Sequence, residues 1–536
     1  MYASAHIDTF TAQNLPTKAL WPELRFDLPE LQYPPRINVT TALIDAALAR
    51  GQGNNTALES PNLSWTYEQL HGIVNQICHV LEQDMGVVAG NRVLLRGANS
   101  PMLAACMLAV WKVGAVAVPS MPLLRAKDLA TIIDKAHITH ALCAAGLRED
   151  LQGAQTLTSV LKTVVYFDDT SADGLAAKMQ NKPIHFAAVD TAADDVCHIA
   201  FTSGTTGVPK GTMHFHRDLL ASCDTFAKHV LKLVPTDRVV GTPPLAFTFG
   251  LGGLLLFPLR VGAAAVLVEK LSPELLLQAI HTHRATVSVT APTFYRLMTP
   301  LAAQYDLSSL AQCMSAGEAL PAATRAAWKA ATGIEMLDGI GSTEMFHIFI
   351  AAAGADVRAG ATGKVVPGYQ AEIFDDNHLV VADGVVGKLA IKGPTGCRYL
   401  ADDRQADYVK QGWNYTGDAY LRDVDGYYWY QARTDDMIVS AGYNIGAPEV
   451  ENSLLTHAAV TECAVIGVAD EARGQIVKAF VVLKTGLLGD ASMVKTLQDH
   501  VKADIAPYKY PRQIEFMTSL PKTETGKLQR FKLKRS

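Results

Sequence analysis

The sequence predicts an α/β protein whose sheets are mainly parallel and covered by helices. Residues 92–96, 102–113 and 115–119 have the pattern of a strand, a helix and a strand, because short apolar runs flank a longer helical one. Residues 264–290 repeat this order. Such alternation makes successive strands parallel and places the helices over the sheet. We therefore expect a large N-terminal domain with two parallel α/β layers.

The sequence pattern changes after Gly360, and the new pattern predicts a small β-rich subdomain at about 361–434. Residues 370–374 and 387–392 alternate apolar and other side chains, and turns rich in Gly, Asp, Asn and Pro follow them. A series of such short strands is typical of a small antiparallel barrel or sheet. We expect a small β-barrel to be attached to the main body here.

A polar run at Arg433–Asp436 marks the main linker. It separates two more apolar segments, and roughly 100 residues of mixed β and α pattern follow it, an ordinary size for an independent domain. At 536 residues the chain also exceeds what a single core normally supports. The predicted division is a large domain at 1–434 and a small α+β domain at 435–536.

Composition and charge exclude several classes of function. Hydrophobic residues make up 49% of the chain and charged residues 18%, which is typical of a packed soluble protein. The net charge of −5 provides no basic surface for nucleic acid. Lys112 and Arg260 interrupt the two apolar stretches that could be mistaken for membrane spans. The first residues lack the pattern of a signal sequence, so we expect a cytoplasmic protein.

The cysteines and paired histidines do not predict a metal site. Eight cysteines are scattered without a Cys-x-x-Cys pair, so we expect reduced thiols in the core. His214 and His216 are two residues apart, as are His281 and His283. Neither pair has a third ligand at a useful spacing, which a zinc site would need.

The most informative segment is Ser203–Gly211, whose composition predicts a phosphate-binding loop. Glycine allows backbone N–H groups to approach an anion closely, hydroxyls donate to phosphate oxygens, and Lys210 adds a mobile positive charge. The preceding run at 196–201 is typical of a buried strand, so the loop should lie at a strand's carboxyl end. It is not a Walker A loop, because Lys210 follows proline and precedes glycine.

Three later segments have features of a nucleotide site. Asp338–Glu344 combines a glycine-rich turn with a hydroxyl and a carboxylate, the hard oxygen ligands that Mg²⁺ on a nucleotide accepts. Tyr415–Asp418 sets a carboxylate just after a tight turn, which suits a ribose diol, although an aspartate in a hairpin turn explains it equally well. Pro521–Lys527 carries a lysine after a Thr/Gly loop, which in isolation is typical of a solvated charge.

Together these motifs resemble, in order and spacing, those of the adenylate-forming superfamily of acyl-CoA synthetases, luciferases and peptide-synthetase adenylation domains. The resemblance extends over essentially the whole chain and includes Ser342–Glu344 and Arg433–Asp436. It implies that a carboxylate and ATP form an acyl-adenylate and pyrophosphate, and that a thiol then displaces AMP. It also implies Mg²⁺, coenzyme A as the second substrate, and a C-terminal domain that is mobile between the two steps.

The resemblance assigns roles residue by residue. The residues that would contact ATP or AMP are Ser203, Thr205, Thr206, Lys210, Gly317, Glu318, Ala319, Asp338, Gly339, Ile340, Asp418 and Arg433. Among them Ser203, Thr205, Thr206 and Lys210 would hold the β- and γ-phosphates, Gly317–Ala319 would line the adenine site, and Asp418 and Arg433 would hold the ribose. Ile340 stands where many relatives place an aromatic residue that stacks on adenine, so its contact would be apolar packing.

The remaining implied roles concern catalysis and domain motion. Lys527 would bridge the acid's carboxylate and the α-phosphate during adenylation, with Thr343 and Glu344 seating Mg²⁺. Asp435 would be the hinge about which the small domain rotates. After rotation Gly442 and Tyr443 would help to form the pantetheine channel of coenzyme A.

Two segments resemble the benzoate branch of this superfamily, and most closely the 2-aminobenzoate (anthranilate) CoA ligases. They are Pro243–Gly253 and Leu337–Phe349. Phe249 would form an aromatic wall against a planar ring, His347 would offer a hydrogen bond near the carboxylate or an ortho substituent, and Ala316 would line the acid site. A core phenylalanine and a satisfied buried histidine are the alternatives. Benzoate, 2-aminobenzoate and hydroxybenzoates all stay open as substrates.

Two other functions compete with this interpretation. One is an enzyme that loads an aryl acid onto a carrier-protein thiol; no carrier domain follows Lys527, so the carrier would be a separate protein. The other is a nucleotide-binding sensor without turnover, which has no physical need for Lys210, Glu344 and Lys527 together. The expected partners are small molecules, with no nucleic acid and no membrane, and a homodimer stays open.

Overall fold

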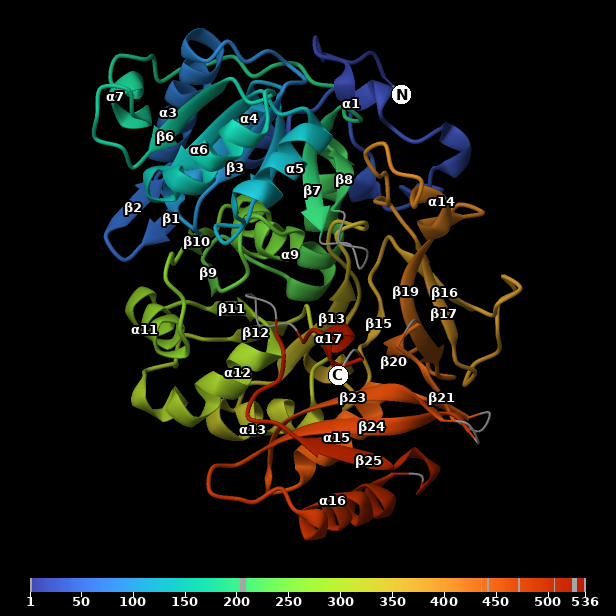
Figure 1. Ribbon diagram of the computed structural model, residues 1–536. Helices are drawn as coiled ribbons and strands as arrows, with labels where there is room; N and C mark the ends of the chain where they lie inside the picture. Colours follow the sequence, from blue (N-terminus) through green and yellow to red (C-terminus); the bar gives the residue numbers. More distant parts are fainter. Residues whose placement is uncertain are drawn as a thin grey trace.

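The computed structural model of the protein describes residues 2–202, 209–434, 436–440, 443–470, 473–505, 507–522 and 528–534. The described residues form four sheets (Figure 1). Two large sheets make up the body of an N-terminal unit, and a third packs beside them. The fourth sheet belongs to a C-terminal unit, which lies at the bottom of Figure 1.

The first large sheet has six strands in the order β6-β5-β3-β4-β7-β8. They are β3 (Arg92–Arg96), β4 (Val116–Ser120), β5 (His140–Ala144), β6 (Thr163–Phe167), β7 (Val196–Thr202) and β8 (Lys210–Phe215). The pairs from β6 to β7 are parallel, whereas β8 runs antiparallel to β7. Strand β3 shows the period of two, because Val93 and Leu95 lie in one apolar core and Leu94 lies in another.

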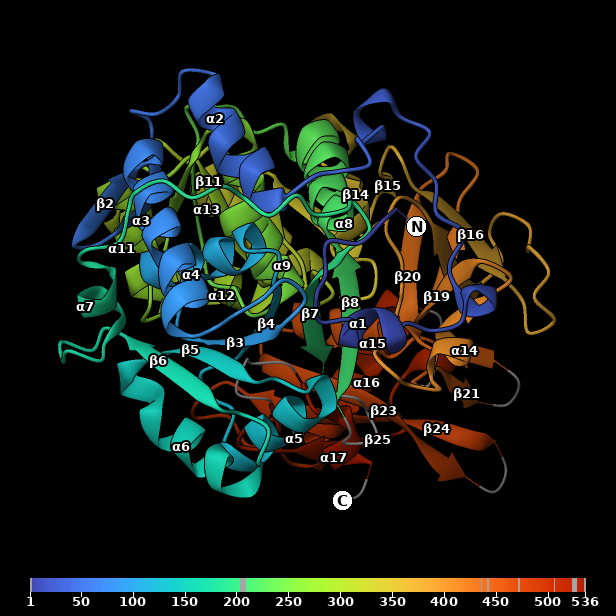
Figure 2. The same cartoon turned by 90° about the horizontal axis from the view of Figure 1, so that it is seen from above.

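Helices cover both faces of this sheet, as Figure 2 shows. The helices on one face are α3 (Tyr67–His79) and α4 (Pro101–Lys112), and those on the other are α5 (Ala126–Ala136) and α6 (Arg148–Leu157). Helix α4 begins at Pro101, where Ser100 caps it by accepting a bond from the N–H of Leu103 at 3.2 Å. The strand, helix and strand expected at 92–119 are confirmed.

The second large sheet has nine strands in the order β15-β14-β13-β12-β11-β9-β10-β1-β2. They are β1 (Thr56–Ser60), β2 (Leu63–Thr66), β9 (Arg238–Gly241), β10 (Ala264–Val266), β11 (Val287–Thr290), β12 (Gln312–Ser315), β13 (Met336–Gly341), β14 (Ile348–Ala352) and β15 (Lys364–Val365). Helices α11 (Pro273–His283), α12 (Pro292–Met298) and α13 (Ala322–Thr332) pack on its outer face. Its inner face shares one large apolar core with the first sheet.

The expectation of parallel layers holds for the centres of both sheets but is wrong at their edges. The central pairs from β1 to β13 are parallel, while β2, β14 and β15 are antiparallel. Strand β2 follows β1 through a tight connection, and two strands joined so closely can pair only antiparallel. The β1–β2 hairpin also belongs to the second sheet although it precedes the first in the chain.

The third sheet is antiparallel throughout and confirms the β-rich segment. Its strands are β16 (Gln370–Phe374), β17 (Gly387–Lys392), β18 (Val409–Lys410), β19 (Trp413–Arg422) and β20 (Tyr428–Arg433). The five strands form an open sheet with β20 paired to β19, and so it is a partial barrel at most. It packs beside the two large sheets at the right of Figure 1.

The C-terminal unit has its own small apolar cores on a five-stranded sheet. Its elements are β21 (Ile438–Ser440), β22 (Tyr443–Ile445), α15 (Ala447–Thr456), β23 (Val460–Asp470), β24 (Gly474–Leu483), α16 (Ala491–Asp504), β25 (Gln513–Phe516) and α17 (Arg530–Leu533). Helix α15 contacts α13 and β20 of the large unit. A guanidinium nitrogen of Arg296 on α12 lies 3.0 Å from Glu462 on β23, which adds an ion pair between the units.

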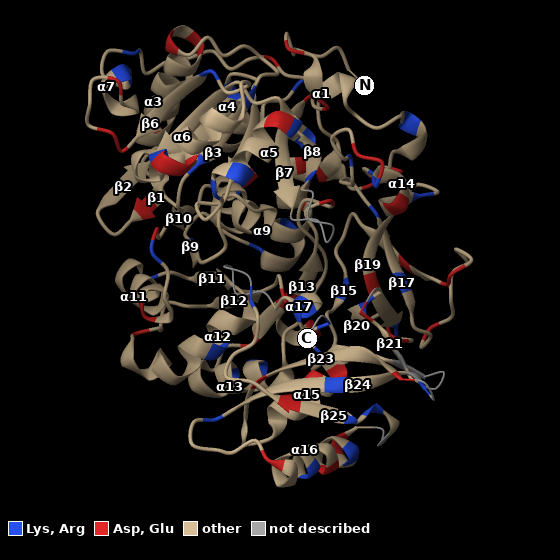
Figure 3. Ribbon diagram, viewed as in Figure 1, with Lys and Arg blue, Asp and Glu red and all other residues tan. Residues whose placement is uncertain are grey.

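Shorter helices complete the fold, and charged groups of both signs are spread over it. The shorter helices are α1 (Phe10–Gln13), α2 (Ala46–Ala49), α7 (Leu175–Met179), α8 (His216–Ser222), α9 (Thr248–Leu251), α10 (Phe257–Val261) and α14 (Gln405–Tyr408). Among the described residues no helix is both long and apolar enough to cross a membrane. Blue and red segments are intermixed over both units in Figure 3. All eight cysteines are free thiols, and all but Cys463 are buried.

Candidate active site

The predicted phosphate loop connects two antiparallel strands. Strand β7 ends at Thr202 and β8 begins at Lys210, and these two residues are paired. Ser203, Thr205 and Thr206 lie outside the described residues. The ammonium of Lys210 is 2.9 Å from the hydroxyl of Tyr399 and 3.6 Å from Oε1 of Glu344. The structure therefore brings Lys210 and Glu344 together.

The segment that carries Glu344 differs from its sequence-based description. Asp338–Gly341 are not part of a glycine-rich turn, since they form the end of strand β13, and the turn comes at residues 342–346. There the N–H of Met345 donates to Oγ of Ser342 at 3.2 Å, and the N–H of Phe346 donates to the carbonyl of Thr343. The glycines instead let β14 approach closely, because a Cβ on Gly339 would lie 2.9 Å from Ile348.

Glu344 has the chemistry that a magnesium nucleotide requires. The residue is only 8% exposed, and both the Tyr399 hydroxyl, at 2.6 Å, and Lys210 approach the same oxygen, Oε1. Carboxylate and hydroxyl oxygens are the ligands Mg²⁺ takes alongside phosphate and water. Thr343 precedes Glu344 in the same turn. These two residues fit the predicted metal-binding role.

Asp418 and Arg433 face one another across two strands. They are directly paired in the β19–β20 ladder, and a guanidinium nitrogen of Arg433 lies 3.1 Å from the Asp418 carboxylate. The expected tight turn before Asp418 is wrong, because Tyr415–Asp418 lie within β19. An irregularity in its pairing with β17 occurs here, and Gly417 has a φ of +79°, which suits glycine. This bulge changes the direction of β19 next to the Asp418 carboxylate.

The residues expected around adenine lie at the carboxyl ends of two neighbouring parallel strands, β12 and β13. Ser315 of β12 pairs with Asp338 of β13, so the loop at 316–319 leaves the sheet beside β13. In that loop Gly317 has a φ of +87°, and Glu318 accepts a bond from the Thr293 hydroxyl at 2.8 Å. Ala319, Gly339 and Ile340 complete the expected adenine set, and the side chain of Ile340 packs on the large apolar core.

Asp338 has the electrostatic property expected of a site residue. Burial raises its pKa to about 7, against a smaller opposing effect of the Arg325 charge. A carboxyl group that titrates near neutrality can either accept or donate a hydrogen bond, and Asp338 lies near the end of its strand. Perturbed carboxyl groups of this kind concentrate at functional sites.

Of the residues expected at the acid site, His347 is a buried imidazole and Phe249 is one of three aromatic rings around it. His347 is 3% exposed, and its ring lies 4.5, 5.5 and 5.9 Å from the rings of Phe257, Phe226 and Phe249. Burial lowers the pKa of His347 to about 3, so the ring is neutral at physiological pH. Nε2 lies 3.4 Å from the carbonyl of Phe249, and Nδ1 is buried without a partner among the described residues. Ala316, also 3% exposed, borders the same apolar core.

The expected catalytic lysine lies in a segment outside the described residues. Lys522 and Leu528, on either side of that segment, are paired antiparallel. Lys522 lies 2.7 Å from Glu462, the residue that also pairs with Arg296 of the large unit. The base of the loop that carries Lys527 thus contacts the boundary between the two units.

The hinge and coenzyme A residues are described in part. Asp435 and Gly442 lie outside the described residues, and of Tyr443 only the backbone is described, in strand β22. Strand β20 ends at Arg433 and β21 begins at Ile438, so the expected hinge falls between the two units.

Sequence reasoning missed the aromatic residues that complete the site. Tyr399 contacts both Lys210 and Glu344, and the hydroxyl of Tyr408 lies 3.2 Å from that of Ser342. Neither tyrosine belongs to a motif with a recognised chemical role. No apolar–polar alternation at Cys397–Leu400 marked Tyr399 as a site residue in the sequence.

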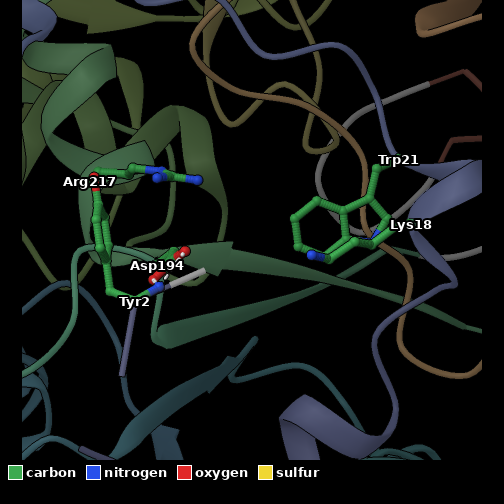
Figure 4. Close-up of a pocket in the computed structure, with 5 residues that line it drawn as sticks. All are labelled: Tyr2, Lys18, Trp21, Asp194 and Arg217. Atoms are coloured by element: carbon green, nitrogen blue, oxygen red, sulfur yellow. Dashed lines mark hydrogen bonds between the residues drawn. The ribbon is translucent and has the colours of Figure 1, made fainter. Parts of the chain in front are cut away.

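A cavity of about 420 Å³, shown in Figure 4, lies outside the predicted nucleotide and acid sites. It is lined by Tyr2, Lys18, Trp21, Asp194 and Arg217. The backbone N–H of Tyr2 donates to the Asp194 carboxylate there, at 3.1 Å. The cavity shares no residue with the predicted nucleotide and acid sites.

Comparisons with known proteins agree with this site. A family model described as AMP-binding enzyme matches residues 45–399, and one described as AMP-binding enzyme C-terminal domain matches residues 449–527. The chain is 36% identical over 512 residues to a benzoate–CoA ligase of Thauera aromatica, covering 94% of this chain and 97% of that protein. It is 31% identical over 508 residues to a 4-hydroxybenzoate–CoA/benzoate–CoA ligase of Rhodopseudomonas palustris, covering 93% and 94%.

Solved structures of similar proteins have the same fold. An anthranilate CoA ligase in complex with anthranoyl-AMP superposes with a TM-score of 0.89 at 35% identity, covering 95% of this chain and 98% of that one. A benzoate CoA ligase from Burkholderia xenovorans LB400 superposes with a TM-score of 0.85 at 32% identity, covering 93% and 100%.

The fold and the two family matches define the class: the chain belongs to the AMP-binding enzyme family, within the adenylate-forming superfamily. Within that family it falls in the benzoate–CoA ligase branch of AMP-forming acid–thiol ligases, to which these relatives belong. The fold class, family and enzyme class predicted from the sequence are confirmed.

Proposed function

We propose that the protein joins an aromatic carboxylic acid, of the 2-aminobenzoate or benzoate type, to coenzyme A through an acyl-adenylate. ATP is cleaved to AMP and pyrophosphate. The observation that carries this proposal is the neutral His347 ring, enclosed by Phe226, Phe249 and Phe257, three residues after Glu344. Flat apolar walls suit an aromatic ring, and edge or offset packing against them adds about 0.5–1.5 kcal/mol to burial.

The tautomer of His347 favours an acid with a hydrogen-bond donor beside its carboxylate. If Nε2–H donates to the Phe249 carbonyl at 3.4 Å, Nδ1 carries the lone pair and can only accept. An ortho amino or hydroxyl group could satisfy this buried acceptor, whereas benzoate could not. The similar proteins include a benzoate–CoA ligase and an anthranilate CoA ligase, and the histidine supports the second substrate.

The other site residues lower the electrostatic barrier to adenylation. A carboxylate and a triphosphate repel each other, so positive charge must lie between them before the carboxylate oxygen can reach the α-phosphorus in line. Lys210 would contact the triphosphate, and Lys527 would bridge the two reacting anions. Thr343 and Glu344 would hold Mg²⁺, which supplies further neutralisation of phosphate charge when it is bound. Asp418 and Arg433 would fix the ribose.

The test is a panel of acids assayed for pyrophosphate and AMP. The panel contains benzoate, 2-aminobenzoate, 2-hydroxybenzoate and a medium-chain aliphatic acid, each with and without coenzyme A. We expect about one equivalent of pyrophosphate per site without coenzyme A, then multiple turnovers and AMP when it is added, with 2-aminobenzoate preferred. Much faster turnover of the aliphatic acid would overturn the substrate class. A phosphopantetheinylated carrier protein that outperformed coenzyme A would overturn the acceptor.

A further inference from the structure

Tyr399 lies between the two charged groups of the proposed triphosphate site. Its hydroxyl donates to Oε1 of Glu344 at 2.6 Å and accepts from the ammonium of Lys210 at 2.9 Å. The ammonium also lies 4.8 Å from the centroid of the Tyr399 ring. Tyr399 is 1% exposed, so water competes little for these contacts.

The uncharged Tyr399 hydroxyl bonds to both the Lys210 ammonium and the Glu344 carboxylate. It has a single proton to donate, and the carboxylate takes it, which leaves a lone pair for the ammonium. A tyrosine hydroxyl has an ordinary pKa of about 10, so it keeps its proton at neutral pH. The ammonium remains 3.6 Å from Oε1 of Glu344, which is beyond hydrogen-bond distance.

The backbone around Tyr399 is fixed against the strand that carries Lys210. Tyr399 and Thr212 of β8 form an antiparallel bridge. The N–H of Met213 donates to the carbonyl of Arg398, and the N–H of Leu400 donates to the carbonyl of Gly211, both at 2.8 Å. Residues 398–400 thus continue the sheet beyond β8, and their side chains alternate between its faces.

The alternation places Arg398 in the protein interior while Tyr399 faces the site. Arg398 is fully buried and pairs with Asp218, whose carboxylate also accepts the N–H of Phe215 at 3.0 Å. The Arg398 guanidinium lies 4.1 Å from the centre of the Phe215 ring. This buried pair ties the segment to the start of α8 (His216–Ser222) and leaves the Tyr399 hydroxyl little freedom to move.

The two charged groups lie within ion-pair distance, and without the Tyr399 hydroxyl they could approach further and form a direct, hydrogen-bonded ion pair. A direct pair would occupy the ammonium that the triphosphate needs and the oxygen that Mg²⁺ needs, so nucleotide binding would first have to break it. We propose that Tyr399 is a positioning residue that keeps Lys210 and Glu344 apart and available for magnesium and triphosphate. This assignment rests on the proposed function, because it takes Lys210 and Glu344 to be the ligands of MgATP.

The test compares Tyr399→Phe with Tyr67→Phe. Both substitutions remove a buried hydroxyl that donates a hydrogen bond; that of Tyr67, the first residue of α3, goes to the carbonyl of Ala263 at 2.7 Å. For Tyr399→Phe we expect the Kd for MgATP, by calorimetry, and the KM for MgATP in pyrophosphate exchange to rise roughly 10- to 100-fold, the range for losing a hydrogen bond to a charged group. The Mg²⁺ concentration for half-maximal rate should rise with them.

Other parameters separate positioning from a general structural effect. The KM for the acid and the conversion of supplied acyl-adenylate to thioester should stay within about twofold in Tyr399→Phe, and Tyr67→Phe should leave the MgATP parameters unchanged. An unchanged Kd for MgATP in Tyr399→Phe would overturn the proposal. So would an equal rise in the KM for the acid, or a Tyr399→Phe protein that is unfolded at the assay temperature. Because calorimetry needs no acid, it gives an answer even if the acid panel refutes the proposed substrate.

Discussion

Replacing Gly252 with alanine should selectively impair use of the acid. Gly252 follows α9 (Thr248–Leu251) in a continuous helix, so its backbone conformation is open to alanine. A Cβ at this position would lie 2.4 Å from Cδ2 and 2.7 Å from Nε2 of His347, and 2.9 Å from the Phe257 ring. Normal carbon contacts are about 3.5–4.0 Å, so the imidazole or the helix must move by roughly 1 Å.

The size of the effect follows from how tightly the imidazole is held. His347 is enclosed by aromatic rings and has little space into which to move. Overpacking of this kind costs about 1–3 kcal/mol of stability, and a displacement of about 1 Å near reacting groups can cost about 10²-fold in rate. We expect kcat/KM for 2-aminobenzoate to fall by 10- to 100-fold while the Kd for MgATP stays constant.

Gly253→Ala is the matched control for this prediction. It adds the same methyl group to the same helix, but the three atoms nearest to its Cβ would all belong to Val289, with Cγ1 at 3.0 Å. The assay is pyrophosphate release at varied acid concentration, with thermal unfolding of both variants. If Gly253→Ala impaired acid use as much as Gly252→Ala, or if Gly252→Ala left acid use unchanged, the assignment of His347 to the acid site would be wrong.

Three further predictions concern charge. Because burial raises the Asp338 pKa from 3.8 to about 7, the folded state holds its proton more tightly, so this residue's contribution to stability is largest below about pH 4 and is lost as the pH rises to about 7. Only about two pKa units of this decline, at about 1.4 kcal/mol each, fall between pH 5 and pH 8, so Asp338→Asn should remove roughly 2–3 kcal/mol of it in urea unfolding at these two pH values, and the exposed Asp356→Asn should not. Arg398→Met leaves Asp218 buried without its charge partner and should lower the free energy of unfolding, measured in urea, by about 3–5 kcal/mol. Adding Asp218→Asn to the same chain should restore part of this loss. If the effects of the two substitutions were simply additive, the two residues would not be coupled. Lys527→Ala should slow pyrophosphate formation by about 10²–10³-fold yet still convert supplied acyl-adenylate to thioester, and equal losses in both steps would refute its role in adenylation alone.

The sequence by itself determined the class of fold and the order of the motifs. Strand and helix periods are local properties, so the elements within 92–119 and 264–290 were predictable from neighbouring residues. The phosphate loop and the Thr343–Glu344 pair could also be predicted from the sequence, and both stay predictions, because each places its chemistry within a few consecutive residues. Their spacing along the chain was enough to identify the family.

Only the tertiary structure decided which side chains meet in the site. Tyr399 is 189 residues from Lys210 and 55 from Glu344, and Arg398 is 180 from Asp218. No local pattern connects residues so far apart, since their contact depends on sheet order and on how strands from different segments pair. The bulge before Asp418 was also decided by the tertiary structure. In the sequence it looked like a turn, because the positive φ of Gly417 suits a turn and a bulge equally well. Local chemistry identified the reactive groups, and packing fixed their distances, their neutral or charged state and the residues that hold them.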